Sequence, residues 1–194
     1  MKKQINGLQN DFKMCPMCGS TKIENHYNRK WICPDCGFDL YNNVAAAVGL
    51  VIYDKNLNVL FEVRAKEPRK GFIALPGGFI DFDESAEEAV ARECQEEIGA
   101  QVKGVKYLCS APNTYVYKNL EYKTCDLFFT AALSPEFDSI EDFIKSLKAE
   151  EDEVVEFKSY KVASLDDVEK LPLAFDSARF TLKRFVENHS EKRS

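Results

Sequence analysis

Two groups of side chains in this sequence have the types and spacing that chemistry requires. Three glutamates, Glu93, Glu96 and Glu97, occur within five residues of one apolar segment. Carboxylates one helical turn apart can hold a hard cation such as Mg²⁺ or Mn²⁺. Two C-x2-C pairs, separated by fourteen residues, can supply the four thiolates of a closed tetrahedral zinc site. They consist of Cys15, Cys18, Cys33 and Cys36.

The cysteine pairs are each followed by a glycine, Gly19 or Gly37, where the backbone must turn at little steric cost. All four ligand positions carry sulfur, so we expect structural Zn²⁺ with no open coordination position for catalysis. Two disulfides, or four thiols with no common role, are the alternatives for these cysteines. Nucleic-acid binding is a minor alternative for residues 1–43, because six Lys or Arg stand against four Asp or Glu there.

The composition indicates a folded protein of a reducing compartment. Hydrophobic residues make up 45% of the 194 residues, which is enough for a sizeable core. The net charge of -6 argues against a bulk binder of nucleic acid or anionic membrane. No apolar run reaches the roughly 18 residues of a membrane span, and the start of the chain lacks the apolar core of a signal peptide. With seven cysteines, an odd number, we expect a cytoplasmic protein with no membrane partner.

The elements that must position these side chains alternate between strand and helix patterns. Residues 44–54 and 59–65 are apolar runs joined by a turn-like segment, which predicts a β-hairpin. Further strands are predicted at 102–117, 121–132 and 154–162, and further helices at 139–153, 164–171 and 175–189. We therefore expect an α/β sandwich. The predicted domains are a zinc ribbon over 1–42, a main domain over 43–188 and a polar tail over 189–194.

The helix that carries the three glutamates is predicted to begin after Ser85 and to stop at Gly99. At about 100° per residue, Glu93 and Glu97 fall inside its apolar face and Glu96 at the edge of that face. That face is formed by Ala86, Ala89, Val90, Cys94 and Ile98. Burial of an unpaired carboxylate costs several kcal/mol or neutralises the group. A bound cation explains the arrangement, and a helix partly exposed along this edge is the alternative.

The loop before this helix favours the bound cation. In "LPGGFIDFDE", Gly77 and Gly78 let backbone amides or carbonyls approach an anion or metal closely. Glu84 and Glu88 are each placed to pair with Arg92, which would fix the loop to the helix.

This stretch resembles the Nudix box, G-x5-E-x7-R-E-U-x-E-E-x-G-U, in which U is a bulky aliphatic residue. The resemblance implies a Nudix α/β/α sandwich with a mixed sheet and a metal-dependent hydrolase of phosphoric anhydride bonds. Cys94 and Ala100 are smaller than the aliphatic residues usual in the box, which concerns packing more than chemistry. Every charged and glycine position is matched, by Gly78, Glu84, Arg92, Glu93, Glu96, Glu97 and Gly99.

The same resemblance implies a role for each site residue. Either Glu93 or Glu96 would orient or deprotonate the attacking water, and Arg92 would orient the glutamates. Glu153, ahead of the strand-like "VVEFKSYK", would complete the metal site. The implied ligands of Mg²⁺ or Mn²⁺ are Gly78 through its backbone, Glu93, Glu96, Glu97 and Glu153.

A four-cysteine ribbon before a Nudix domain resembles the NADH pyrophosphatase branch of the family, and also plant zinc-ribbon Nudix proteins that act on FAD or ADP-ribose. The branch signature S-Q-P-W-P-F-P-x-S is absent, since only Ser110 and Pro112 match it in "SAPNTYVYK". The implied substrates are ADP-ribose, FAD or NAD(H), with NAD-capped RNA as a further candidate. Other nucleic-acid partners are not expected, and a homodimer is the family-based expectation.

Substrate contacts are the least constrained part of the interpretation. Tyr115 and Tyr117 are candidates for stacking on a base, although alternating tyrosines pack equally well within a sheet. The rival function is a non-catalytic ligand sensor or a nucleic-acid-associated regulator. Such a protein is expected to lose box glutamates, whereas this chain keeps all of them.

Overall fold

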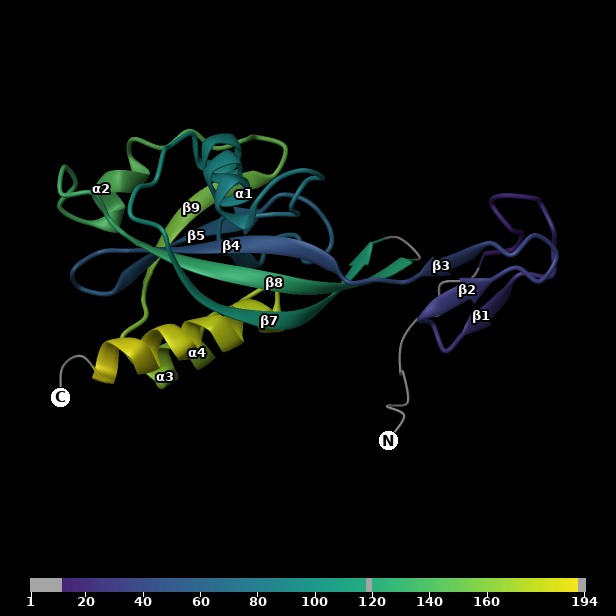
Figure 1. Ribbon diagram of the computed structural model, residues 1–194. Helices are drawn as coiled ribbons and strands as arrows, with labels where there is room; N and C mark the ends of the chain where they lie inside the picture. Colours follow the sequence, from purple (N-terminus) through teal and green to yellow (C-terminus); the bar gives the residue numbers. More distant parts are fainter. Residues whose placement is uncertain (1–11, 118–119, 192–194) are drawn as a thin grey trace. The chain divides into compact units, whose positions relative to one another are not determined.

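The computed structural model describes residues 12–117 and 120–191 of the chain. Two compact units are present, one of Met1–Ala45 with Thr114–Lys123 and one of Ala46–Asn113 with Thr124–Ser194. The first unit contains a three-stranded antiparallel sheet (Figure 1). Its strands are β1 (Glu24–His26), β2 (Lys30–Ile32) and β3 (Asp39–Tyr41).

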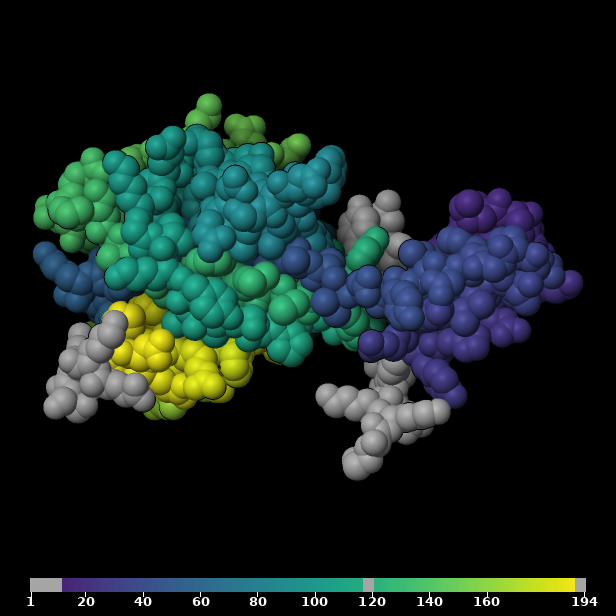
Figure 2. All heavy atoms as spheres, in the orientation of Figure 1, coloured from purple at the N-terminus to yellow at the C-terminus, as the bar shows by residue number. Residues whose placement is uncertain are grey.

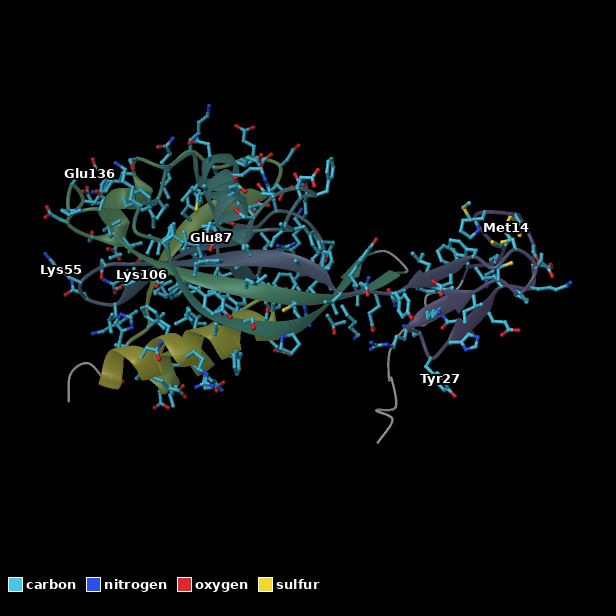
Figure 3. The ribbon with its side chains drawn as sticks, viewed as in Figure 1. Met14, Tyr27, Lys55, Glu87, Lys106 and Glu136 are labelled. Carbon is cyan, nitrogen blue, oxygen red and sulfur yellow. The ribbon has the colours of Figure 1, made fainter. Side chains whose placement is uncertain are left out.

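The two cysteine knuckles of the first unit have the same backbone geometry. The amide of Cys15 donates to the carbonyl of Ser20 at 2.8 Å, and the amide of Cys33 donates to that of Phe38 at 2.8 Å. Gly19 and Gly37 both adopt φ of 74°, in the left-handed region that favours glycine. Sulfur atoms gather beside the labelled Met14 in Figure 3. The repeated pattern therefore brings two equivalent turns to one place.

A six-stranded sheet forms the centre of the second unit, in the order β6-β5-β4-β8-β7 with β9 also paired to β5. The hairpin predicted from residues 44–54 and 59–65 is confirmed, since Tyr53 pairs with Val59 in antiparallel register. The strands are β4 (Ala45–Tyr53), β5 (Asn58–Arg64), β6 (Ile73–Ala74), β7 (Lys106–Tyr117), β8 (Leu120–Ala132) and β9 (Val154–Lys161).

Helices cover both faces of this sheet (Figure 1). On one face lie α1 (Ala86–Glu93), the π-helical turn η1 (Cys94–Ile98) and α2 (Ile140–Ile144). On the other lie α3 (Leu165–Glu169) and α4 (Asp176–Glu191). In the space-filling view, α4 packs directly against the teal and green strands (Figure 2). The predicted α/β sandwich is confirmed.

Alternation along β5 divides the core between the two faces. Val59, Phe61 and Val63 pack in the cluster that contains the buried face of α4. Leu60 packs in the other cluster, with Val90 of α1 and its neighbours. Since side chains of a strand alternate between faces, the residue two positions after Leu60 also faces α1.

The helix predicted at 139–153 is wrong beyond its first turns, since α2 ends at Ile144. The segment that follows uses its amides elsewhere. Lys148 donates to the carbonyl of Ile98 at 3.2 Å, and Glu150 donates to that of Glu97 at 3.3 Å. These tertiary bonds replace helical ones and anchor the loop to η1. At the C-terminal end, α4 continues through Glu191 and so includes part of the predicted tail. No helix in the described residues is both long and apolar enough to span a membrane.

Candidate active site

The helix of the box begins and ends where its sequence predicts. The Ser85 side chain accepts the amide of Glu88, and the Glu88 side chain accepts the amide of Ser85, which completes a capping box. The last turn widens into η1 and stops at Gly99, which has φ of 66°. Such π-helical turns occur often at functional sites.

The burial of the three box glutamates follows the helical periodicity. Glu93 and Glu97 are only 9% and 7% exposed, whereas Glu96 is exposed to solvent. The alternative of a helix whose glutamates are all solvated is therefore wrong. Two carboxylates lie on the buried face of one helix.

The two glycines of the loop are required by close contacts. A Cβ on Gly78 would lie 2.5 Å from Oε1 of Glu93, and one on Gly77 would lie 2.2 Å from the carbonyl oxygen of Val48. The amide of Gly77 donates to Oε2 of Glu97 at 2.6 Å. The carbonyl of Gly78 already accepts the amide of Val48 at 2.8 Å, so one lone pair of this predicted metal ligand is in use.

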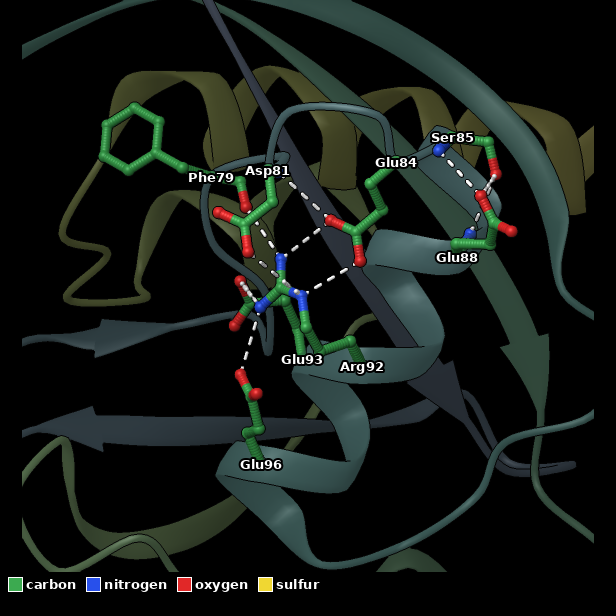
Figure 4. Close-up of polar contacts among 8 residues, drawn as sticks. All are labelled: Phe79, Asp81, Glu84, Ser85, Glu88, Arg92, Glu93 and Glu96. Atoms are coloured by element: carbon green, nitrogen blue, oxygen red, sulfur yellow. Dashed lines mark hydrogen bonds and ion pairs between the residues drawn. The ribbon is translucent and has the colours of Figure 1, made fainter.

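Arg92 is the centre of the polar network that fixes the loop to the helix (Figure 4). Its guanidinium donates to both oxygens of Glu84, at 2.9 and 3.0 Å, and to the carbonyl of Phe79 at 2.9 Å. It also donates to Glu93 at 2.8 Å and to Glu96 at 3.0 Å. The bond to Arg92 lowers the pKa of Glu84. Arg92 is thus hydrogen-bonded to three glutamates, and its role in orienting them stays a prediction.

The predicted pair between Glu88 and Arg92 is wrong. Oε2 of Glu88 accepts the amide of Ser85 at 2.8 Å and its hydroxyl at 2.7 Å (Figure 4). The capping box competes for this carboxylate and leaves the guanidinium to Glu84.

A third buried carboxylate of this region, Glu62 on β5, was not expected from the sequence. It is 4% exposed and lies two positions after Leu60, on the face of the sheet that α1 covers. Its Oε1 has no hydrogen-bond partner. The signal that would have found it is a single acidic residue at a buried alternate position of the strand "VLFEVR".

Burial and mutual repulsion raise the pKa values of these carboxyl groups. Burial, followed by the charge of Glu93, raises the pKa of Glu62 to about 8. Burial and the charge of Glu62 raise the pKa of Glu97 well above its usual range. Burial also raises the pKa of Glu93, although the hydrogen bond from Arg92 opposes this effect.

Glu153 lies just before β9, half exposed, and pairs with Lys66 at 2.9 Å. Its charge contributes to the raised pKa values of Glu62, Glu93 and Glu97. The structure therefore brings the predicted residue Glu153 to the same acidic region as the buried box glutamates.

The donor set of this region fits a hard divalent cation. The donors are all oxygens, and neither Glu62 nor Glu97 forms an ion pair with Lys or Arg within the described residues. Mg²⁺ and Mn²⁺ prefer such ligands. Arg92 donates to Oε1 of Glu93 and the amide of Gly77 to Oε2 of Glu97, so a cation would bind through the other oxygen of each carboxylate.

The four ribbon cysteines form a second candidate metal site. They are the only set of three or more acidic, thiol or imidazole groups in 12–117 and 120–191 whose ligand atoms all lie within 4.8 Å. The sulfurs of Cys15 and Cys36 are 3.7 Å apart, as are those of Cys18 and Cys33. Tetrahedral Zn–S bonds of about 2.3 Å place sulfurs about 3.8 Å apart. All seven cysteines are free, so the alternative of two disulfides is wrong.

The candidate stacking residues lie in the segment Thr114–Lys123, which belongs to the first unit. Tyr115 belongs to β7 and is half-buried. Tyr117 ends the same strand, and its side chain lies outside the described residues. Base stacking by either residue stays a prediction.

The sequence is similar to those of curated NAD-capped RNA hydrolases. NAD-capped RNA hydrolase NudC of Vibrio cholerae is 26% identical over 139 residues, and that of Pseudomonas aeruginosa is 30% identical over 100 residues. These matches cover 72% and 50% of this chain but only 51% and 34% of those proteins. The chain thus spans about half the length, or less, of these curated relatives.

Solved structures share the fold of most of the chain. The NUDIX domain of Shewanella oneidensis NrtR complexed with ADP ribose has a TM-score of 0.57 at 24% identity, covering 84% of this chain and 94% of that one. A NUDIX hydrolase from Nitrosomonas europaea has a TM-score of 0.56 at 23% identity, covering 93% of each. A family model described as NUDIX domain matches residues 44–183, which is most of the sequence. The chain therefore belongs to the NUDIX domain family.

Proposed function

We propose that this protein is a divalent-metal-dependent pyrophosphohydrolase that cleaves a nucleoside diphosphate linked to another moiety, X. The observation that carries the proposal is the buried carboxylate of Glu97, which lies in an intact Nudix box and has no cationic side chain as partner. A carboxylate in that position needs a bound cation to remain charged.

The residues of the site would have two roles, to bind the metal and to activate water. When bound, Mg²⁺ or Mn²⁺ would neutralise phosphate charge and position the pyrophosphate. Glu93, Glu97 and Glu153 would hold the cation, with Glu96 and the Gly78 carbonyl as further ligands. Either Glu93 or Glu96 would orient the water or accept its proton, which is typically worth about 10² to 10⁴ in rate.

In the reaction, the water oxygen bonds to one phosphorus of the pyrophosphate while the bridging P–O bond breaks. The products are a nucleoside monophosphate and the phosphate of X. Dinucleotide-like substrates are proposed, namely ADP-ribose, FAD or NAD(H). Similarity to an NAD-capped RNA hydrolase and to the NrtR domain complexed with ADP ribose supports the inclusion of NAD-capped RNA and ADP-ribose among the compounds to be tested.

The test is a hydrolysis screen of the purified protein with Mg²⁺ or Mn²⁺. The panel contains ADP-ribose, FAD, NADH, NAD-capped RNA, diadenosine polyphosphates and nucleoside triphosphates. We expect metal-dependent release of a nucleoside monophosphate from at least one dinucleotide-like compound. Binding of ADP-ribose with no turnover of any compound would replace the enzyme by a ligand sensor. A DNA-bound structure of NrtR, 26% identical with a TM-score of 0.52, gives that alternative its specific support.

We also propose that the ribbon binds Zn²⁺ and that the protein is a cytoplasmic homodimer. The zinc assignment is supported by the spacing of the four sulfurs. The location is supported by the free cysteines, and the dimer by family resemblance alone.

Arg92→Lys should lower kcat about 100-fold, the scale of a misplacement of about 1 Å at a catalytic site. Lysine cannot reproduce the bidentate contact with Glu84 while also reaching Glu93. Steady-state kinetics on the substrate found in the screen provide the measurement. Arg184→Lys is the matched control, since Arg184 is exposed on α4, where it contacts Glu187 and the ring of Phe180. Equal kcat for the two variants would show that Arg92 does not position the site.

A further inference from the structure

Glu62 occupies a position in the sheet where a carboxylate has no structural use. It lies in β5 with Ala74 and Phe157 as its register partners on the two neighbouring strands. Its side chain is 4% exposed and shares a sheet face with the apolar Leu60. A leucine would pack at such a position without the cost of desolvating a charge.

The basic residues nearest to Glu62 in sequence are engaged elsewhere. Arg64 donates from Nε to the carbonyl of Pro68 at 3.0 Å, and its guanidinium lies 5.1 Å from the ring centre of Phe175. Lys66 pairs with Glu153. Oε1 of Glu62 is therefore buried and accepts no hydrogen bond from the described residues.

The side chain of Glu62 points into the acidic region of the box. It shares a side-chain hydrogen bond with Glu97, and the charges of Glu93 and Glu153 act on it. Glu62 comes from the sheet, whereas Glu93 and Glu97 come from the helix that covers this face. Glu62 and Glu97 thus meet across the space between strand and helix.

We propose that Glu62 is an additional ligand of the divalent cation, contributed by the floor of the sheet opposite the box helix. The inference rests on the proposed metal-dependent function. The Oε1 atom of Glu62 would bind the cation, in the same region as Glu97. The all-oxygen chemistry of Mg²⁺ and Mn²⁺ suits this added carboxylate.

A role limited to hydrogen bonding with Glu97 makes a different prediction. In that role Glu62 only accepts a hydrogen bond from the neighbouring carboxyl group, and the amide oxygen of a glutamine accepts equally well. As a metal ligand, Glu62 supplies negative charge that glutamine lacks. Glu62→Gln separates the two roles because it keeps the size of the side chain and removes its charge.

The experiment measures Mn²⁺ binding directly, from the electron paramagnetic resonance signal of free Mn²⁺ in a titration of the zinc-containing protein. Glu62→Gln and Glu62→Ala should each weaken binding about tenfold or more, the scale seen when the surroundings of a metal site are altered. The matched control is Glu156→Gln, an exposed glutamate of β9 paired with Lys158. Without Mn²⁺, the thermal midpoint of Glu62→Gln should not fall, since burial and the charge of Glu93 disfavour the ionised form of Glu62 and glutamine is neutral.

The variant Glu97→Gln distinguishes a failure of this inference from a failure of the proposed function. If Glu62→Gln binds Mn²⁺ within twofold of the wild type while Glu97→Gln binds weakly, Glu62 is not a ligand and the box site stands. If all variants bind Mn²⁺ as the wild type does, the box does not hold the cation, and both proposals are overturned. A shared loss in Glu62→Gln and Glu97→Gln, with Glu156→Gln unchanged, supports both.

Discussion

Glu97→Gln should lower kcat by about 10² to 10⁴, which corresponds to several kcal/mol of lost charge stabilisation by the metal. The glutamine keeps the acceptor oxygen for the amide of Gly77, so the loop conformation should survive. It removes the buried charge that would hold the cation. Because that charge is repelled by Glu62 in the metal-free protein, the variant should unfold at the same temperature or higher. Metal-dependent turnover and thermal unfolding provide the two measurements.

The control for this substitution lies on the same helix. Glu87 belongs to the first turn of α1 and is exposed (Figure 3), so Glu87→Gln removes one charge without touching the buried face. It should retain kcat within a few-fold of the wild type. A comparable loss of kcat in both variants, or full activity in Glu97→Gln, would contradict a catalytic metal at the box.

The site was predictable from the sequence where the signal is local. The capping box, the stop at Gly99 and the buried side of Glu93 and Glu97 all follow from residue types within one helix. The helical period of 3.6 residues determines which face of the helix each residue occupies. Widening of the last turn into η1 did not move Glu97 to the surface.

The parts that were missed depend on contacts between distant segments. Glu62 joins the site only because β5 passes beneath α1, a relation that no local pattern contains. Residues 145–153 leave the helical state because their amides reach Ile98 and Glu97 of η1. Glu88 turns to Ser85 because the capping box competes with the pair to Arg92. Tertiary contacts decided the first two cases, whereas in the third one local contact was preferred over another.

Removal of metal from the ribbon should unfold it and shift the fluorescence of Trp31 to longer wavelength. Trp31 is the only tryptophan of the chain, so its emission reports on the ribbon alone. Only Cys15, Trp31 and Cys33 are buried within residues 12–45, and two of these are metal ligands. A core of this size does not stabilise a fold unaided. Zinc binding to such sites contributes about 10–16 kcal/mol at neutral pH, enough to decide whether the ribbon folds.

Cys33→Ser should reproduce the effect of a zinc chelator, because Cys33 is fully buried among the four sulfurs. Cys125→Ser, at a half-buried thiol outside the cluster, is the matched control and should leave the emission of Trp31 unchanged. Metal analysis of the wild type should find one Zn²⁺ per chain in reducing buffer. Unchanged Trp31 emission in a preparation shown to be free of zinc would mean that the packing of Trp31 against Phe12, with ring centres 5.0 Å apart, maintains the ribbon without metal.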